Sequence, residues 1–145
     1  MQNPEYESLK LENQLCFPLY AVSRKIIGLY TPHLKPLGLT YTQYLVFLVL
    51  SERDEITVGK LCEILYLDNG TLSPLLKTMQ KNGYLKRERS TSDERTVYIS
   101  LTEQGRQMLG NLKDIPEKVG KCVPVSPEKA VLLYQALYEM LHELS

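Results

Sequence analysis

The fold is decided by residues 57–102, TVGKLCEILYLDNGTLSPLLKTMQKNGYLKRERSTSDERTVYISLT. In the first half of this stretch apolar residues recur every three or four positions, which predicts two short helices. Thr57 is a suitable N-cap for the first helix, and Asp68-Asn69-Gly70 interrupts the pattern between the two. Two short helices joined by a tight, glycine-containing turn are the signature of a helix-turn-helix.

The second half of the stretch changes to a period of two. A polar turn at Ser90–Glu94 separates two alternating runs, and Gly83 before them is suited to end the second helix. The alternating positions are Leu85, Arg87 and Arg89, then Val97, Ile99 and Leu101. With a further helix expected after the capping box of Thr40 and Gln43, residues 40–102 are predicted to form a winged helix-turn-helix. The expected fold class is mainly α with a small β-hairpin wing (α+β).

An amphipathic helix is predicted before this unit. It should begin near Asn13 or later, because Pro18 is tolerated only in a first turn, and end near Tyr30, before Pro32. Cys16 would then lie in or beside the first turn.

Two further helices are predicted after the wing, capped by Thr102 and by Ser126. These helices and the first one carry more apolar surface than a small winged unit needs to bury. The economical use of that surface is a two-fold dimer interface. We therefore expect one domain over residues 1–145, with 9–34 and 103–145 as its helical dimerisation part.

Composition excludes several classes of protein. The chain has 145 residues, and its longest apolar run, Tyr44–Leu50, is far shorter than the roughly 20 residues of a membrane span. The N-terminus has neither the basic start nor the apolar core of a secretion signal, so we expect a cytoplasmic location. Three cysteines are too few and too scattered for a disulfide framework, and neither they nor the two histidines suggest a metal site. We expect no metal and no cofactor.

The net charge of zero hides a local concentration of basic residues. Between Lys77 and Arg89 a single glutamate stands against five basic residues: Lys77, Lys81, Lys86, Arg87 and Arg89. On the second helix of the pair and the adjoining hairpin, this excess is what a protein that binds duplex DNA needs. We include Lys81, Arg87 and Arg89 in the predicted DNA-binding surface. The alternative is a solvated basic face without a partner.

Four strings of the sequence resemble a known family: LENQLCF (11–17), LGLTYTQYLVFLVL (37–50), LYLDNGTLSPLLKTM (65–79) and DERTVYISLTEQG (93–105). They are similar to the MarR family of dimeric winged-helix repressors, and in particular to its organic hydroperoxide sensor branch, OhrR. Residues 106–145 match only as helical dimerisation sequence. The resemblance implies a homodimer that binds a double-stranded DNA operator and is inactivated when an organic hydroperoxide oxidises Cys16. It implies a repressor and not an enzyme.

The resemblance also implies roles for residues of the DNA-binding surface. Thr71, Ser73 and Lys77 would enter the major groove. Arg95 at the hairpin tip would reach into the minor groove, with Asp93 orienting it through a charge-assisted hydrogen bond. A simple cap of the turn is the alternative role of Asp93.

Cys16 resembles the peroxide-sensing thiol of the family. The thiolate is the nucleophile, a helix N-terminus favours the anion, and attack on a peroxide oxygen gives a sulfenic acid. Tyr20, Tyr30 and Tyr41 match the family's tyrosines around the thiol, and Tyr30 and Tyr41 of one subunit would hydrogen-bond Cys16 of the other. Their hydroxyls would stabilise the thiolate, and their rings would form an apolar pocket suited to organic peroxides.

The other two cysteines have different expected roles. Members of the family with a second cysteine in the C-terminal region form an intersubunit disulfide, and Cys122 lies near that place. We favour this resolving role over an inert thiol. Cys62 falls on a buried helical stripe and is expected in the core.

Other functions remain as alternatives. One is a regulator of the same fold whose pocket binds a small phenolic ligand instead of using Cys16. Another is a broader redox or virulence regulator of the same fold. A thiol peroxidase would turn over excess hydroperoxide, but no base or arginine is evidently placed to activate it. A winged-helix interaction module would bind no DNA.

Overall fold

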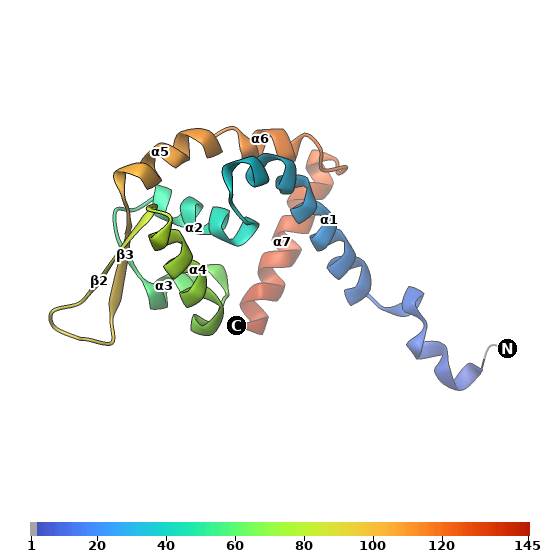
Figure 1. Cartoon of the computed structure of the whole chain (residues 1–145). Coiled ribbons are helices and arrows are strands. Elements are labelled where there is room, and N and C mark those ends of the chain that lie inside the picture. The colour runs from blue at the N-terminus through green and yellow to red at the C-terminus, as the bar shows by residue number, and fades with distance from the viewer. Residues whose placement is uncertain (1–2) are drawn as a thin grey trace. The chain divides into compact units, whose positions relative to one another are not determined.

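A computed structural model describes residues 3–145 of the chain (Figure 1). They form two compact units, the first ending at Ile115 and the second running from Pro116 to Ser145. The first unit contains α1 (Cys16–Leu34), α2 (Tyr41–Ser51), β1 (Ile56–Thr57), α3 (Val58–Leu65), α4 (Asn69–Lys81), β2 (Leu85–Arg89), β3 (Val97–Leu101) and α5 (Glu103–Leu112). The helix α6 (Ile115–Gly120) begins at the boundary, and α7 (Pro127–Leu144) belongs to the second unit.

The first unit contains the predicted winged helix-turn-helix. Helices α3 and α4 pack together, and β2 and β3 form the hairpin that projects from them in Figure 1. The short β1 pairs with the other edge of β3, so the antiparallel sheet has the order β1-β3-β2. This third strand was not predicted, because two residues are too few to show an alternation.

Polar side chains at the helix starts confirm the predicted caps. Thr40 Oγ1 accepts the Gln43 N–H at 3.3 Å and the Gln43 side chain accepts the Thr40 N–H at 3.0 Å, which makes the reciprocal capping box. Thr57, Thr102 and Ser126 each accept the backbone N–H three residues further on. Each bond satisfies one of the donors that a helix start leaves unpaired.

The predicted end of the first helix was wrong. α1 does not stop near Tyr30 but continues through Pro32 to Leu34. Proline removes one backbone hydrogen bond, but the Lys35 N–H still bonds to the Thr31 carbonyl in the last turn. Leu34 is only 2% exposed, so burial of its side chain favours the extra turn.

The predicted turn between the paired helices also differs from the structure. Tyr66 ends α3 in the left-handed region, with φ of 54°, and Asp68 already caps α4. Asn69 and Gly70 therefore lie in the first turn of α4, and the connection contains no glycine. Asp68 has the sequence signature of both a turn residue and an N-cap, and it acts here as the cap.

The core of the first unit lies between its helices and one face of the sheet. Its fully buried apolar side chains are Val46, Phe47, Leu61, Leu72, Leu76, Met79 and Ile99. Large apolar side chains are exposed, by contrast, at the start of α1 and along α7. Leu15, which directly precedes α1, is 82% exposed, and Tyr134 of α7 is 63% exposed. In a single chain this surface is unburied, as expected of helices that pack against a second copy. No helix within residues 3–145 is long and apolar enough to cross a membrane.

Candidate DNA-binding surface and thiol site

Helix α4 presents the residues predicted to read DNA bases. Its start is fixed by Asp68, whose Oδ1 accepts the Thr71 N–H at 2.6 Å. Hydrogen bonding with Thr71 lowers the pKa of the Asp68 carboxyl. Leu72, Leu76 and Met79 anchor the inner face of the helix. The opposite side leaves Thr71, Lys77 and Lys81 exposed, and Ser73 is half-buried.

The wing tip is an ordered polar turn. Asp93 Oδ1 accepts the Arg95 backbone N–H at 3.0 Å, and its Oδ2 accepts the Thr96 hydroxyl at 3.3 Å. Arg89 Nη1 donates to the Glu94 carbonyl at 3.2 Å. The Asp93 carboxylate thus caps the turn through the Arg95 backbone, and the exposed Arg95 guanidinium has no ion-pair partner among residues 3–145.

The structure brings two of the predicted tyrosines together. The ring centroids of Tyr30 on α1 and Tyr41 on α2 lie 4.9 Å apart, edge to face. Both rings border a cavity of about 440 Å³, which Leu34 and Lys35 also line. Tyr20 is not part of this cluster: it is exposed, and its ring lies 5.3 Å from the Arg24 guanidinium.

Tyr44 is a third member of the cluster, and its side chain is buried. Its ring lies 5.4 Å from Tyr30 and 6.0 Å from Tyr41. Burial raises the pKa of Tyr41, and burial followed by the neighbouring phenols raises the pKa of Tyr44 to about 12. Tyr41 and Tyr44 are three residues apart in one helix and so share a face, which was the signal for this contact in the sequence.

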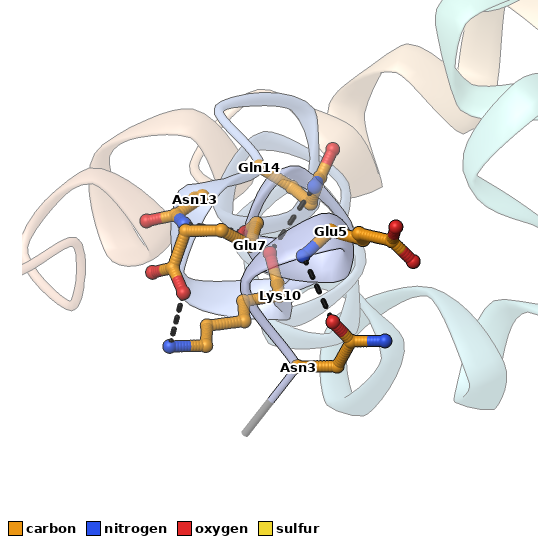
Figure 2. A network of polar contacts seen from close by, with 6 residues as sticks. All are labelled: Asn3, Glu5, Glu7, Lys10, Asn13 and Gln14. Atoms are coloured by element: carbon orange, nitrogen blue, oxygen red, sulfur yellow. Dashed lines mark hydrogen bonds and ion pairs between the residues drawn. The ribbon is translucent and has the colours of Figure 1, made fainter.

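Cys16 is exposed at the first residue of α1, as predicted. Two short 3-10 helices, Pro4–Leu9 and Leu11–Asn13, lead up to it. Asn13 Nδ2 donates to the Glu7 carbonyl at 2.8 Å and so joins the two helices. Figure 2 shows two further contacts of this segment: Gln14 Nε2 donates to the Lys10 carbonyl at 3.1 Å, and Lys10 pairs with Glu7 at 2.7 Å. The thiol therefore follows an internally bonded segment.

Cys16 and Tyr30 lie toward opposite ends of α1. The helical rise between them is about 21 Å, so the Cys16 thiol is far beyond hydrogen-bond reach of the Tyr30 hydroxyl in the same chain. Contact between a Cys16 thiol and the Tyr30–Tyr41 pair therefore requires a second copy of the chain.

The remaining cysteines differ in their surroundings. Cys122 is exposed in the second unit, in the turn after α6, where its N–H donates to the Val119 carbonyl at 2.9 Å. Cys62 on α3 is half-buried. Burial, and then the charge of Asp68, raises the pKa of the Cys62 thiol. No group of three or more His, Cys, Asp or Glu side chains within residues 3–145 is arranged to hold a metal ion.

A winged helix-turn-helix that exposes a basic second helix and a basic wing defines a DNA-binding transcriptional regulator. Comparison with known proteins identifies the family more closely. A family model described as transcriptional regulator SarA/Rot matches residues 28–112. An organic hydroperoxide resistance transcriptional regulator of Bacillus subtilis (strain 168) is 46% identical over 144 residues, which cover 99% of this chain and 97% of that protein.

Two solved structures of AbfR, a protein of Staphylococcus epidermidis, are also similar. Reduced AbfR bound to DNA has a TM-score of 0.77 at 37% identity, covering 99% of this chain and all of that one. Disulfide-formed AbfR has a TM-score of 0.67 at 36% identity, with coverage of 97% and 96%. The chain belongs to the MarR-type winged-helix transcriptional regulators, in the branch that contains the SarA/Rot and organic hydroperoxide resistance regulators. This family consists of regulators and not of enzymes.

Proposed function

We propose that this chain is a homodimeric repressor that releases its DNA operator when an organic hydroperoxide oxidises Cys16. The observation that carries the proposal is the distance between the thiol and the phenols suited to activate it. The exposed Cys16 begins α1, whereas Tyr30, which packs against Tyr41, lies about four turns further along the same helix. A two-fold dimer brings the thiol of one copy to the phenols of the other. The B. subtilis relative, named for organic hydroperoxide resistance, supports this assignment.

The chemistry at Cys16 is a two-electron oxidation. The Cys16 thiolate attacks the terminal oxygen of the hydroperoxide, an S–O bond forms, and the O–O bond breaks. The leaving alkoxide takes a proton and departs as an alcohol, and Cys16 becomes a sulfenic acid. Tyr41 and Tyr44 are protonated at neutral pH, as a tyrosine of ordinary pKa already is, and their raised pKa values do not change this. The Tyr41 hydroxyl serves as a donor to the thiolate of the partner.

Cys122 of the partner is the proposed resolving thiol. Its thiolate attacks the sulfur of the Cys16 sulfenic acid, an S–S bond forms and the S–O bond breaks. The leaving hydroxide takes a proton from solvent and departs as water. Cys122 is exposed, as this step requires, and AbfR has been solved in a disulfide-formed state. In non-reducing electrophoresis after treatment with cumene hydroperoxide, we expect a covalent dimer from the wild type and none from Cys122→Ser. A Cys62→Ser control should still form the dimer; a wild type that forms none excludes the resolving role.

The DNA part of the proposal places α4 in the major groove and the wing in the minor groove. Thr71, Ser73 and Lys77 would contact base edges and phosphates, and Arg95 would enter the minor groove. Residues 40–102 would thus bind the operator, while 9–34 and 103–145 hold the two copies together. A regulator that acts on DNA fits the expected cytoplasmic location.

A second candidate function comes from the Tyr30–Tyr41 cavity. Its volume of about 440 Å³ falls in the range of roughly 300–1,000 Å³ common for small-molecule sites. Phenol groups and Lys35 at its border would suit a small phenolic or carboxylate ligand. In such a regulator, Cys16→Ser would leave the response to the ligand unchanged. In a peroxide sensor, the same substitution would abolish the response to peroxide.

A further inference from the structure

Tyr44 has no role in the sensing step as proposed above, although it belongs to the tyrosine cluster. Its side chain is only 2% exposed, and it is not among the residues that line the cavity bordered by Tyr30 and Tyr41. Those two tyrosines are half-buried. Tyr44 therefore lies on the core side of the cluster, where it meets the other two rings and not an incoming thiol.

The three rings support one another in pairs. The Tyr44 ring is tilted by 43° against Tyr30 at a centroid distance of 5.4 Å, and by 40° against Tyr41 at 6.0 Å. Aromatic pairs at such distances attract each other in addition to the apolar area that they bury. Tyr44 thus restrains one ring from α1 and one ring from its own helix at the same time.

The hydroxyls of Tyr30 and Tyr41 need such a restraint for the proposed chemistry. A donor stabilises a thiolate only at hydrogen-bond distance and at a suitable angle, so neighbouring side chains must hold its rotamer. The capping box of Thr40 and Gln43 fixes the backbone at Tyr41, but it does not fix rotation about the side-chain bonds of Tyr41. Both rings border the cavity, which offers no packing on that side, and Tyr44 packs against both.

We propose that Tyr44 is a positioning residue of the sensing step: its ring holds the Tyr30 and Tyr41 rings so that their hydroxyls can bond the Cys16 thiolate of a second copy. The inference rests on the proposed function, and it adds a residue that acts through its neighbours without touching the thiol. Because the ring makes these contacts, an aromatic side chain without a hydroxyl should suffice. Loss of the ring would leave space into which the neighbouring rings can turn.

Substitutions of Tyr44 test this role through the rate at which cumene hydroperoxide oxidises Cys16. The loss of free Cys16 thiol is followed by peptide mass spectrometry. Tyr44→Leu should slow the oxidation about tenfold, which is the scale of one hydrogen bond to a charged group. Tyr44→Phe keeps the ring and should keep most of the wild-type rate.

Phe47→Leu is the matched control for general damage to the core. Phe47 is fully buried in the same helix, but its ring packs against Tyr84 at a centroid distance of 5.6 Å, outside the tyrosine cluster. Like Tyr44→Leu, the substitution removes a buried ring, so it should lower the free energy of unfolding by a similar amount. It should leave the rate of Cys16 oxidation unchanged. Urea unfolding of both variants establishes that they are folded and comparable.

The pH profile of Cys16 alkylation by iodoacetamide is a readout that a loss of core packing alone would not move. Misplaced Tyr30 and Tyr41 hydroxyls give the thiolate fewer hydrogen bonds, which disfavours the charged form. Tyr44→Leu should therefore move the profile to higher pH, whereas Phe47→Leu should leave it in place.

A measurement on the reduced wild type does not depend on how a variant folds. Nuclear Overhauser cross-peaks should join the ring protons of Tyr44 to those of both Tyr30 and Tyr41. Absence of these cross-peaks, an unchanged oxidation rate in Tyr44→Leu, or equal slowing in Tyr44→Phe or Phe47→Leu would overturn the inference while leaving Cys16 as the sensor. A wild type whose Cys16 resists the peroxide would instead overturn the proposed function, and this role with it.

Discussion

At the residue scale, the tyrosine cluster combines buried aromatic rings with hydroxyl groups that can donate hydrogen bonds. Tyr30, Tyr41 and Tyr44 come from two helices and lie ring against ring, and burial is the main cause of the raised pKa values of Tyr41 and Tyr44. A buried phenol that keeps its proton is a hydrogen-bond donor, which is the property a thiolate partner requires.

The first prediction concerns Tyr44. Its pKa of about 12 exceeds the ordinary value of 10.0, so the stability it contributes is complete below pH 10 and is lost as pH rises through 12. We expect the near-ultraviolet absorbance of tyrosinate to show a late component whose amplitude Tyr44→Phe lowers, and the variant to lose less stability over that pH interval. Tyr41, whose pKa is also raised, keeps its own contribution. A late component of unchanged amplitude in Tyr44→Phe would contradict the assignment.

The second prediction concerns Cys62. Because burial and the charge of Asp68 raise its pKa, less thiolate is present at neutral pH than in an exposed thiol of ordinary pKa. Alkylation by iodoacetamide, followed by peptide mass spectrometry, should label Cys62 more slowly than the exposed Cys16 and Cys122. Asp68→Asn keeps a capping side chain but removes the charge, and it should speed the reaction at Cys62. Equal rates at all three cysteines would refute this ordering.

Side chains differ in how far the sequence predicts their positions. Cys16 could be placed at the start of α1, because the proline that follows it marks a first turn. The buried Nε of Arg87 could not be foreseen, because it depends on the register with Ile99, which a strand pattern alone does not specify.

At the element scale, α5 begins against the end of α4. The Thr102 hydroxyl donates to the Gly83 carbonyl at 2.5 Å, and Gly105 in the first turn of α5 has no room for a side chain. A Cβ at Gly105 would collide with the carbonyl oxygen of Tyr84 and come within 3.1 Å of Leu101. This close approach couples the base of the wing to the helix that follows it.

The third prediction compares two glycines of α5. Gly105→Ala should lower the free energy of unfolding by about 1–3 kcal/mol, because the colliding atom belongs to the backbone. A Cβ at Gly110 would meet nothing within 4 Å, so Gly110→Ala should raise the free energy of unfolding by up to about 1 kcal/mol through its better helix propensity. Urea unfolding of both variants checks the signs; the same sign for both would show that the close approach does not constrain α5.

Helix boundaries were predictable where a side chain caps them and less so where tertiary packing decides. Thr40, Thr57, Thr102 and Ser126 all cap helices at the expected positions. The extra turn of α1 beyond Pro32 is favoured by burial of Leu34, which local sequence rules do not contain.

At the scale of the whole molecule, the uneven distribution of charge and the exposed apolar helices both fit a dimer that binds DNA. The basic residues between 77 and 89 lie on the surface proposed to bind DNA, and the exposed apolar side chains of α1 and α7 belong to helices expected to meet a second copy. A dimer is also what the sensing step needs, because one chain holds its thiol and its phenols at different ends of α1. Oxidation that changes the dimer would therefore change the spacing of the two DNA-binding units.

The most direct test of this account is the operator affinity of the wild type and of Cys16→Ser, measured before and after one equivalent of cumene hydroperoxide. The wild type should lose affinity within the roughly 5- to 150-fold range typical of coupled sites, and dithiothreitol should restore it. Cys16→Ser should bind the operator with the same affinity before and after the peroxide. A wild type that keeps its affinity, or a Cys16→Ser variant that loses it to the same extent, would contradict the account.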